Sequence, residues 1–525
     1  MNSYLWVLLL VCAGQLLHAA APDLIVRHAW VVDGTGNPAR LADVAVSKGR
    51  IVAVGRVAEK AATEIEAAGL IVAPGFIDVH THADDIATQP LAENFLRMGV
   101  TSLVAGNCGS STLEVARFFK RLETARVSPN VATLIGHGSV RKQAMGGSFN
   151  RPPTPAEMQR MREMVRRGMK EGAAGLSTGL IYLPGEFAKT DELVELAQVA
   201  AEFDGLYATH MRSEGREIFQ ALEEAFTIAR QAHLRLEISH LKLSGKSAWG
   251  QANQVLAAIE RARAGGVEVT QDQYLYTAAS TGISQLVPEQ YREGGRFAAH
   301  LAAPQTKLAM IAEMKQRLKN RGYADFSYAV IAHYPPDVSL NGLNLVEAAR
   351  QKRGSDSLDD QIELILEIES QGGATGVFHG MNEDDLRLIA RHPNTMFASD
   401  SGVRIPGEGV PHPRGYGNCA RALERYVREL GLLRLEDAVR RMTSLPAATF
   451  RLQDRGLVRE GCWADLVIFD PALVADQATY RDPHHYATGF AWVFVNGVAV
   501  VKNDAHTGAR PGRALRHKAT TLRYE

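Results

Sequence analysis

The sequence predicts an α/β protein: a closed (β/α)8 TIM barrel with a small β-sandwich domain built from both chain termini. Three observations predict this fold. Short apolar runs alternate with amphipathic helical stretches over about 350 residues, as in a parallel sheet with helical crossovers. Several of these runs end in a polar side chain that can bind a metal. Short β-like runs also occur near both ends of the chain.

The composition is that of a globular protein. The chain has 525 residues, of which 46% are hydrophobic and 22% charged, and its formal net charge is zero. This length suffices for one large domain and a smaller one. Because the charge is balanced and no basic run occurs, nothing favours a nucleic-acid partner, and we expect a small-molecule substrate. The composition leaves the oligomeric state open.

The N-terminus resembles a signal peptide over residues 1–21. An apolar run at 5–17 precedes the small-residue stretch Ala19-Ala20-Ala21 and is too short to span a bilayer comfortably. We therefore expect secretion, to the periplasm, with no stable membrane insertion. An uncleaved anchor is the alternative, because no Lys or Arg precedes the run. Cleavage would leave Cys108, Cys419 and Cys462, which make no disulfide framework for a chain of this size.

Both ends of the chain contain short β-like runs. They lie at 24–27, 30–34, 43–46 and 50–55, and again at 464–470 and 491–500. We expect one small β domain, formed by residues 22–70 and 451–510 and followed by a tail at 511–525. Two unrelated β appendages are the alternative.

Residues 71–450 are expected to form the barrel. Predicted strands lie at 101–105, 131–135, 175–177, 206–209, 234–239, 267–271 and 396–399. Predicted helices lie at 155–171, 190–203, 217–232, 252–264 and 435–443. The stretch at about 284–344 breaks this alternation, and we expect an insertion there over the barrel mouth.

A further apolar strand ends in His80-Thr81-His82, followed two residues later by Asp84. In an extended strand residues i and i+2 project on the same side, so both imidazoles can enter one cavity. Imidazoles at a strand end beside a carboxylate form half of a divalent metal site. Taken alone, the pattern also fits ordinary strand-end histidines.

Other strands end in equally suggestive side chains, namely Cys108, His137, His210, His240 and Asp400. The C-terminal ends of barrel strands converge on one face. Because several of these ends carry a residue that can bind metal, the sequence predicts a metal site there. Cys108, His210 and His240 suit Zn²⁺ with one position open, and a thiolate should belong to the tight site. His80 and His82 could form a second, weaker position. Asp400 is the expected general base. His137 either orients substrate or caps its strand end.

Several motifs carry a family resemblance over about residues 23–510. They are Gly106-Asn107-Cys108-Gly109, Ile135-Gly136-His137-Gly138, Gly175-Leu176-Ser177-Thr178-Gly179, Thr209-His210-Met211-Arg212, Ser239-His240-Leu241-Lys242, Ser399-Asp400-Ser401-Gly402 and His412-Pro413-Arg414. Together with the His-x-His strand end, they resemble the amidohydrolase superfamily, and within it the D-aminoacylases (N-acyl-D-amino-acid deacylases). A cysteine ligand replaces the carboxylated lysine of other members, and Ser177-Thr178 stands where binuclear members carry that lysine.

The resemblance implies zinc-dependent hydrolysis of N-acyl-D-amino acids to a carboxylate and a free D-amino acid. It assigns the tight zinc site to Cys108, His210 and His240, and the second position to His80, His82 and Asp400, with Asp400 as catalytic base. The substrate carboxylate would be held by Arg414 with help from Tyr274 and Ser280. Lys242 would supply a polar contact, and Met381 would line the pocket. A dipeptidase, or another amidohydrolase acting on an amide with a free carboxylate, is the alternative.

The chain departs from the family pattern at two places. Leu275 replaces the usual proline between Tyr274 and Tyr276, and the loop at 402–411 is about three residues longer. Both departures lie at the mouth and the carboxylate clamp, so they bear on substrate identity and leave the metal ligands unchanged.

Overall fold

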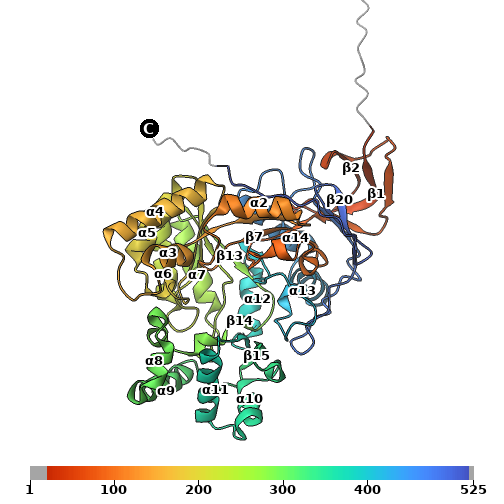
Figure 1. Cartoon of the computed structure of the whole chain (residues 1–525). Coiled ribbons are helices and arrows are strands. Elements are labelled where there is room, and N and C mark those ends of the chain that lie inside the picture. Colours follow the sequence, from red (N-terminus) through yellow and green to blue (C-terminus); the bar gives the residue numbers. More distant parts are fainter. Residues whose placement is uncertain (1–20, 519–525) are drawn as a thin grey trace, which may run out of the picture.

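A computed structural model describes residues 21–518, so the expected signal segment, apart from its last residue, and the end of the tail lie outside the described residues. A closed parallel barrel forms the centre of the molecule (Figure 1). Its eight strand positions are β6 (Phe76–Asp78), β7 (Val100–Ala105), β8 (Asn130–Thr133) continued by β9 (Ile135–Gly136), β10 (Gly175–Gly179), β11 (Leu206–His210), β12 (Arg235–Ile238), β13 (Val269–Gln273) and β17 (Thr395–Phe397). The predicted fold class is confirmed.

The barrel closes between β17 and β6, just beyond their C-terminal ends. Thr81 and Ser401 form a parallel bridge there. The Asp400 N–H donates to the His80 carbonyl, and the His82 N–H donates to the Ser401 carbonyl, both at 2.9 Å. Closure of the barrel therefore brings the predicted base beside the two histidines of the first strand.

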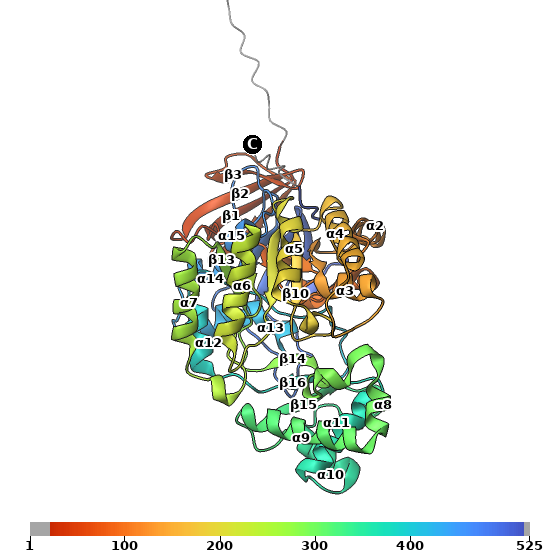
Figure 2. The ribbon, with the colours of Figure 1, turned by 90° about the vertical axis from the view of Figure 1, so that its left-hand side faces the viewer.

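Helices surround the barrel (Figure 2). They are α1 (Glu93–Leu96), α2 (Val115–Ala125), α3 (His137–Met145), α4 (Pro155–Lys170), α5 (Thr190–Ala201), α6 (Ile218–Ala232), α7 (Ala252–Ala264), α12 (Glu383–Arg391), α13 (Arg414–Arg421), α14 (Leu435–Met442) and α15 (Ser444–Thr449), with a π-helical stretch at Ala422–Glu429. Helix α4 shows how the sequence sets such an element. Thr154 and Glu157 form a capping box, and Pro155 occupies the first turn, where its missing N–H costs nothing.

Strands from both termini form one nine-stranded sheet at one end of the barrel (Figure 1). They are β1 (Leu24–Val31), β2 (Arg40–Ser47), β3 (Arg50–Gly55), β4 (Thr63–Glu66), β5 (Ile71–Pro74), β18 (Leu466–Phe469), β19 (Phe490–Val495), β20 (Val498–Lys502) and β21 (Ala505–His506). Strand β5 pairs with both β1 and β18, so it joins the N-terminal and C-terminal parts into the single β domain that was predicted.

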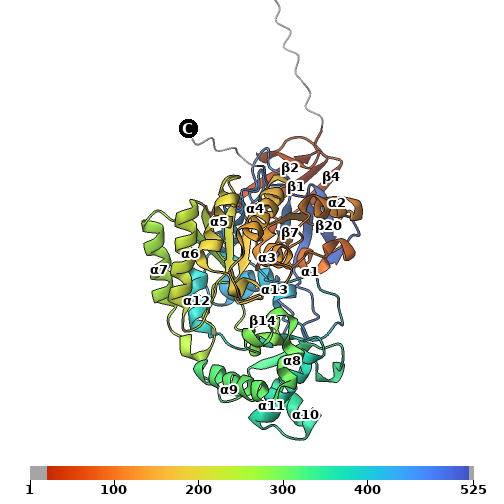
Figure 3. The same ribbon diagram turned by 60° about the vertical axis from the view of Figure 1, so that its left-hand side comes forward.

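A separate lobe is inserted between β13 and β17. It contains β14 (Ala279–Gly282), β15 (Ala329–His333), β16 (Thr375–Phe378), α8 (Phe297–Ala302), α9 (Pro304–Asn320), α10 (Leu345–Arg353) and α11 (Leu358–Ser370). The lobe has its own apolar core and lies at the end of the barrel away from the β domain (Figure 3). It reaches further than the expected 284–344, because β16 pairs with both β14 and β15 and completes the small sheet.

Among residues 21–518, no helix combines the length and apolar character needed to cross a membrane. Cys108, Cys419 and Cys462 are buried free thiols.

Candidate metal centre

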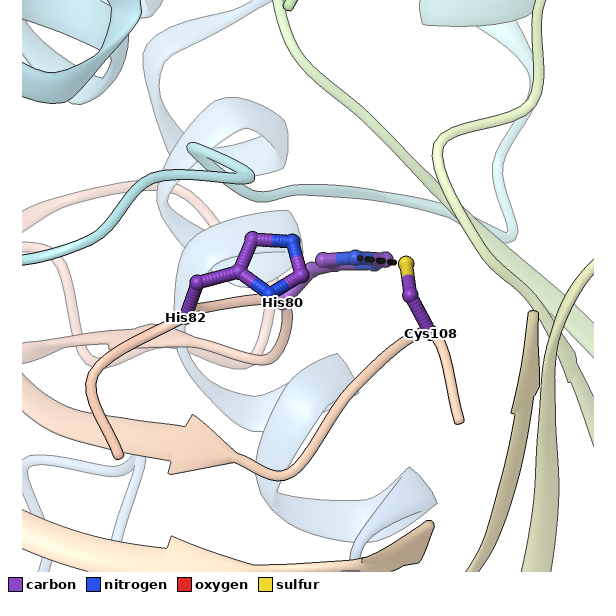
Figure 4. Close-up of side chains that lie close together, drawn as sticks. All are labelled: His80, His82 and Cys108. Carbon is purple, nitrogen blue, oxygen red and sulfur yellow. Dashed lines mark hydrogen bonds between the residues drawn. The ribbon is translucent and has the colours of Figure 1, made fainter. Parts of the chain in front are cut away.

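Six side chains converge at the C-terminal ends of the barrel strands. His80, His82 and Cys108 form one group of potential ligands, Cys108, His210 and His240 a second, and His80, His240 and Asp400 a third. Within each group the ligand atoms lie within 4.8 Å of one another. Figure 4 shows His80 facing Cys108 across a short gap, with His82 beside them. All six metal residues predicted from the sequence are therefore brought together.

Three of these residues have a left-handed backbone. The φ angles are 53° at Cys108, 36° at His240 and 50° at Asp400. Non-glycine residues adopt this region at a cost of about 1 kcal/mol or more, and such strain clusters at functional sites. Each of the three follows a barrel strand, so the strained turn at the strand end aims the side chain across the barrel mouth.

The Cys108 loop is supported from strand β10. The Ser177 hydroxyl accepts a hydrogen bond from the Gly109 N–H at 3.1 Å and donates one to the Gly106 carbonyl at 2.5 Å. Gly179 makes room for the loop, because a Cβ there would lie 2.2 Å from the Cys108 carbonyl oxygen. Ser177 thus holds the loop that supplies the cysteine.

Cys108 lies at the centre of the cluster. Its Sγ is 3.2 Å from His80 Nε2, 3.8 Å from His210 Nδ1 and 3.7 Å from His240 Nε2. Burial alone would raise the pKa of the thiol, but the His80 charge and hydrogen bonds from the three imidazoles lower that pKa well below its ordinary value. A thiolate there can reach the His210–His240 side and the His80 side alike.

Asp400 joins the cluster on the His80 and His82 side. Its Oδ1 lies 3.0 Å from His82 Nε2 and 3.6 Å from His80 Nε2, and its Oδ2 lies 2.8 Å from Arg414 Nη1. Burial would raise the pKa of this carboxyl, but the Arg414 charge and the histidines hold that pKa well below its usual range. The group is therefore an ionised carboxylate, as a general base must be.

The donor set fits zinc. One thiolate and two imidazoles are the ligands of a catalytic zinc site with an open position. Burial lowers the pKa of His210, which favours the neutral imidazole that binds metal. The buried His210 Nε2 has no hydrogen-bond partner among the described residues, so the ring is held by its Nδ1 contact with Cys108.

Two carboxylates orient the ligand imidazoles, and the sequence reasoning missed both. Glu214 Oε1 lies 3.0 Å from His240 Nδ1, and Asp272 Oδ2 lies 3.2 Å from His80 Nδ1. A carboxylate on the second ring nitrogen fixes the tautomer and orientation of a metal-binding histidine. The available signals were weak: Glu214 follows His210 by four residues in a loop, and Asp272 is a polar residue within strand β13.

Two cavities flank the cluster. One of about 790 Å³ extends towards the inserted lobe, which contributes Arg292 and Arg317 to its wall. The other, of about 620 Å³, lies on the side of His82 and Cys108. They share four lining residues, Tyr182, Ser280, Thr281 and Asp400. A substrate whose scissile bond lies at Asp400 can therefore extend into both cavities.

The predicted carboxylate-binding residues line these cavities. The Arg414 guanidinium stacks over the Tyr274 ring at 4.4 Å, and Arg414 Nη2 lies 3.5 Å from the Ser280 carbonyl oxygen. The buried Tyr274 hydroxyl has no hydrogen-bond partner within residues 21–518. Lys242 Nζ lies 2.5 Å from Glu214 and 2.9 Å from His240 Nδ1. Arg414 and Tyr274 thus leave polar groups available for a ligand, whereas the Lys242 ammonium already has a partner.

Two predicted substrate contacts lie apart from the others. His137 Nε2 lies 2.8 Å from Glu192, which also pairs with the buried Arg141. Met381 is buried, and its N–H donates to the Thr277 carbonyl. Neither side chain lines either cavity as far as the described residues show. His137 therefore pairs with a side chain of helix α5, and this contact is neither a substrate contact nor a cap of the strand end.

Comparisons with known proteins agree with this geometry. Residues 63–501 match the model of the amidohydrolase family. The sequence is 35% identical to a D-aminoacylase of Alcaligenes xylosoxydans xylosoxydans, over 95% of this chain and 98% of that one. An N-acyl-D-glutamate deacylase of the same organism is also 35% identical, over 95% and 97%.

A solved structure shows the same architecture. An N-acyl-D-glutamate deacylase from Bordetella bronchiseptica, complexed with zinc and a phosphonate inhibitor that mimics the tetrahedral intermediate, superposes with a TM-score of 0.81 at 35% identity. The match covers 94% of this chain and 100% of that chain.

Proposed function

The chain belongs to the amidohydrolase family, and we propose that it is a zinc-dependent deacylase that hydrolyses N-acyl-D-amino acids to a carboxylate and a free D-amino acid. One observation carries the proposal. A Cys-His-His ligand set, an ionised Asp400 and the buried Arg414 meet at one point between two cavities. The D configuration follows from the relatives, which are D-aminoacylase and N-acyl-D-glutamate deacylase.

Cys108, His210 and His240 would hold the tight zinc, and His80, His82 and Asp400 surround a second position. Zinc held there supplies Lewis-acid polarisation of the acyl carbonyl and lowers the pKa of water at the site. The chain's own residues make this possible, since Glu214 and Asp272 fix two of the ligand imidazoles through their second ring nitrogens.

Asp400 transfers a proton from the attacking water to the departing nitrogen. Its carboxylate is kept ionised by Arg414 and the histidines, so it can accept the proton of the attacking water. The same group, then neutral, can deliver that proton to the departing nitrogen, which leaves as the amine of the D-amino acid.

Arg414 recognises the substrate. It lines the smaller cavity with its guanidinium over the Tyr274 ring, and Nε has no hydrogen-bond partner in the described part of the chain. An arginine presents a planar fork that matches a carboxylate, so the α-carboxylate of the substrate can bind here, with the Tyr274 hydroxyl and Ser280 beside it.

The proposal is tested by hydrolysis of N-acetyl-D-methionine. Protein purified without its first 20 residues is stripped of metal with a chelator, and methionine release is measured before and after one equivalent of zinc is added. We expect release only with zinc. Equal release by the stripped protein would contradict a zinc deacylase.

We also propose that the enzyme acts in the periplasm. The support is the apolar run at residues 5–17 followed by small residues, which resembles a secretory signal. Fractionation of cells that express the full-length chain tests this, because a periplasmic enzyme is released by osmotic shock.

A further inference from the structure

The smaller cavity carries an excess of positive charge. Its lining includes Lys142, Arg404 and Arg414, whereas Asp400 is the one carboxylate among the residues that line it in the described chain. Asp400 is already paired with Arg414 at 2.8 Å and with His82 at 3.0 Å. The cavity therefore offers cationic groups for which the protein itself supplies no anion.

Arg404 is held in place by contacts that extend to the segment of Arg414. The buried Asn94 side chain accepts a hydrogen bond from the Arg404 N–H at 3.2 Å and donates one to the Gly415 carbonyl at 2.9 Å. Arg404 Nε donates to the Ser401 hydroxyl at 2.9 Å. One asparagine thus ties the start of the 402–411 loop to the backbone next to Arg414.

Gly415 leaves the space that the Arg404 side chain occupies. A Cβ at this position would lie 3.1 Å from Arg404 Nε and 2.4 Å from the Ser401 hydroxyl oxygen. The side chain is thus fixed at its Nε end by packing and by a hydrogen bond. This arrangement orients the guanidinium in advance and lowers the entropy cost of binding a ligand.

The Arg404 guanidinium has no carboxylate partner. Across residues 21–518, no Asp or Glu oxygen lies within 4.0 Å of its nitrogens. Burial and the nearby Arg414 charge together lower the pKa of Arg404 to about 10, so the group stays charged at neutral pH. A half-buried cation that has no ion-pair partner within 4.0 Å in the described chain gains from an anionic ligand.

We propose that Arg404 binds a second carboxylate of the substrate, so that the preferred substrates are N-acyl-D-amino acids that carry two carboxylates. This inference rests on the proposed function, in which Arg414 binds the α-carboxylate. Arg404 lies on the loop at 402–411, which contributes Gly402, Arg404 and Pro411 to the wall of the smaller cavity. The second carboxylate can come from an acidic amino-acid side chain or from a dicarboxylic acyl group, and both present the same chemistry.

The test compares kcat/KM of the zinc-loaded enzyme on matched pairs of substrates. N-acetyl-D-glutamate is compared with N-acetyl-D-glutamine, and N-succinyl-D-methionine with N-butanoyl-D-methionine. The first pair probes the side chain and the second the acyl group. A hydrogen-bonded charge pair contributes about 10- to 100-fold in affinity, so we expect the dicarboxylate of at least one pair to be favoured by at least about tenfold.

Variants assign this preference to Arg404. Arg404→Met should remove it while leaving kcat/KM on the neutral member of each pair within about twofold, and Arg404→Lys should restore part of it. Arg56→Met removes one exposed positive charge in the β domain and should leave the preference intact. The retained activity on the neutral substrates shows that the variant is folded.

Three results would overturn the inference while leaving the proposed function intact. Wild type could cleave the neutral substrates and show no preference in either pair. The preference could survive Arg404→Met. Arg404→Met could instead lower all four activities equally, which would place Arg404 on the α-carboxylate or in the fold. Absence of any cleavage would refute the proposed function itself, and with it this inference.

Discussion

Glu214 allows the sharpest prediction, because it touches both a metal ligand and a buried cation. Its Oε1 lies 3.0 Å from His240 Nδ1 and 2.5 Å from Lys242 Nζ, and the three side chains are 9%, 2% and 4% exposed. Glu214→Gln keeps the size and removes the charge. The amide can still contact the ring, but it no longer stabilises the imidazole as a metal ligand.

The expected loss follows from these contacts. Removal of a carboxylate from the second nitrogen of a ligand histidine lowers metal affinity about 10- to 100-fold, or about 1.4 to 2.7 kcal/mol. Folding stability falls as well, because Lys242 keeps its buried charge without a counter-ion. Zinc affinity is measured by competition with a chromophoric chelator, and thermal unfolding is followed on the same samples.

Glu224→Gln is the matched control. Glu224 is also a partly buried glutamate, and it pairs with Arg212 at 2.9 Å instead of with a ligand imidazole. We expect the Glu224→Gln variant to bind zinc with the same affinity as the wild type. A Glu214→Gln variant with unchanged zinc affinity but a lower Tm would refute the reasoning, since Glu214 would then serve folding alone.

Three further predictions concern the general base Asp400, the proposed carboxylate-binding Arg414 and the titrating carboxyl of Glu186. Asp400→Asn should lower kcat about 10²- to 10⁴-fold while one zinc stays bound, measured by turnover and metal analysis; loss of that zinc would contradict its role as base. Arg414→Met should lower kcat/KM on N-acetyl-D-methionine about 30-fold or more at unchanged zinc content, and a smaller change would exclude the carboxylate clamp. Burial raises the pKa of Glu186 to about 7 from 4.5, so the stabilising contribution of its bound proton is present at low pH and lost as pH rises through 7. Glu186→Gln should therefore be more stable than wild type at pH 8, by about 1 to 3 kcal/mol in urea unfolding, and this gain should shrink by pH 5; a gain that is equal at both pH values would contradict the prediction.

The barrel was predictable because each of its strands can be recognised from a short local sequence pattern. Apolar runs that end in His, Cys or Asp place those side chains on one face whatever the exact barrel dimensions. The helix at 252–264 was predicted with its observed bounds, since its apolar positions repeat with helical spacing. The inserted lobe was the weak point. Its last strand, β16, lies far along the chain from β14, and no local sequence pattern indicates that the two strands pair.

The ligands were predictable, whereas the residues that orient them were not. His80, Cys108 and His240 are rare residue types at strand ends, but Glu214 is an ordinary charged residue in a loop. Its role depends on a contact with His240 at the end of the neighbouring strand β12, a separation of 26 residues that no local pattern encodes. The same holds for Asn94, which joins the Arg404 loop to the segment after Arg414 from more than 300 residues away.

The most direct test of the central claim is the hydrolysis of N-acetyl-D-methionine against N-acetyl-L-methionine by the zinc-loaded enzyme, with Asp400→Asn in parallel. We expect the D enantiomer alone to be cleaved and Asp400→Asn nearly to abolish the reaction. Cleavage of the L enantiomer at an equal rate, or cleavage of neither by protein with zinc bound, would contradict it.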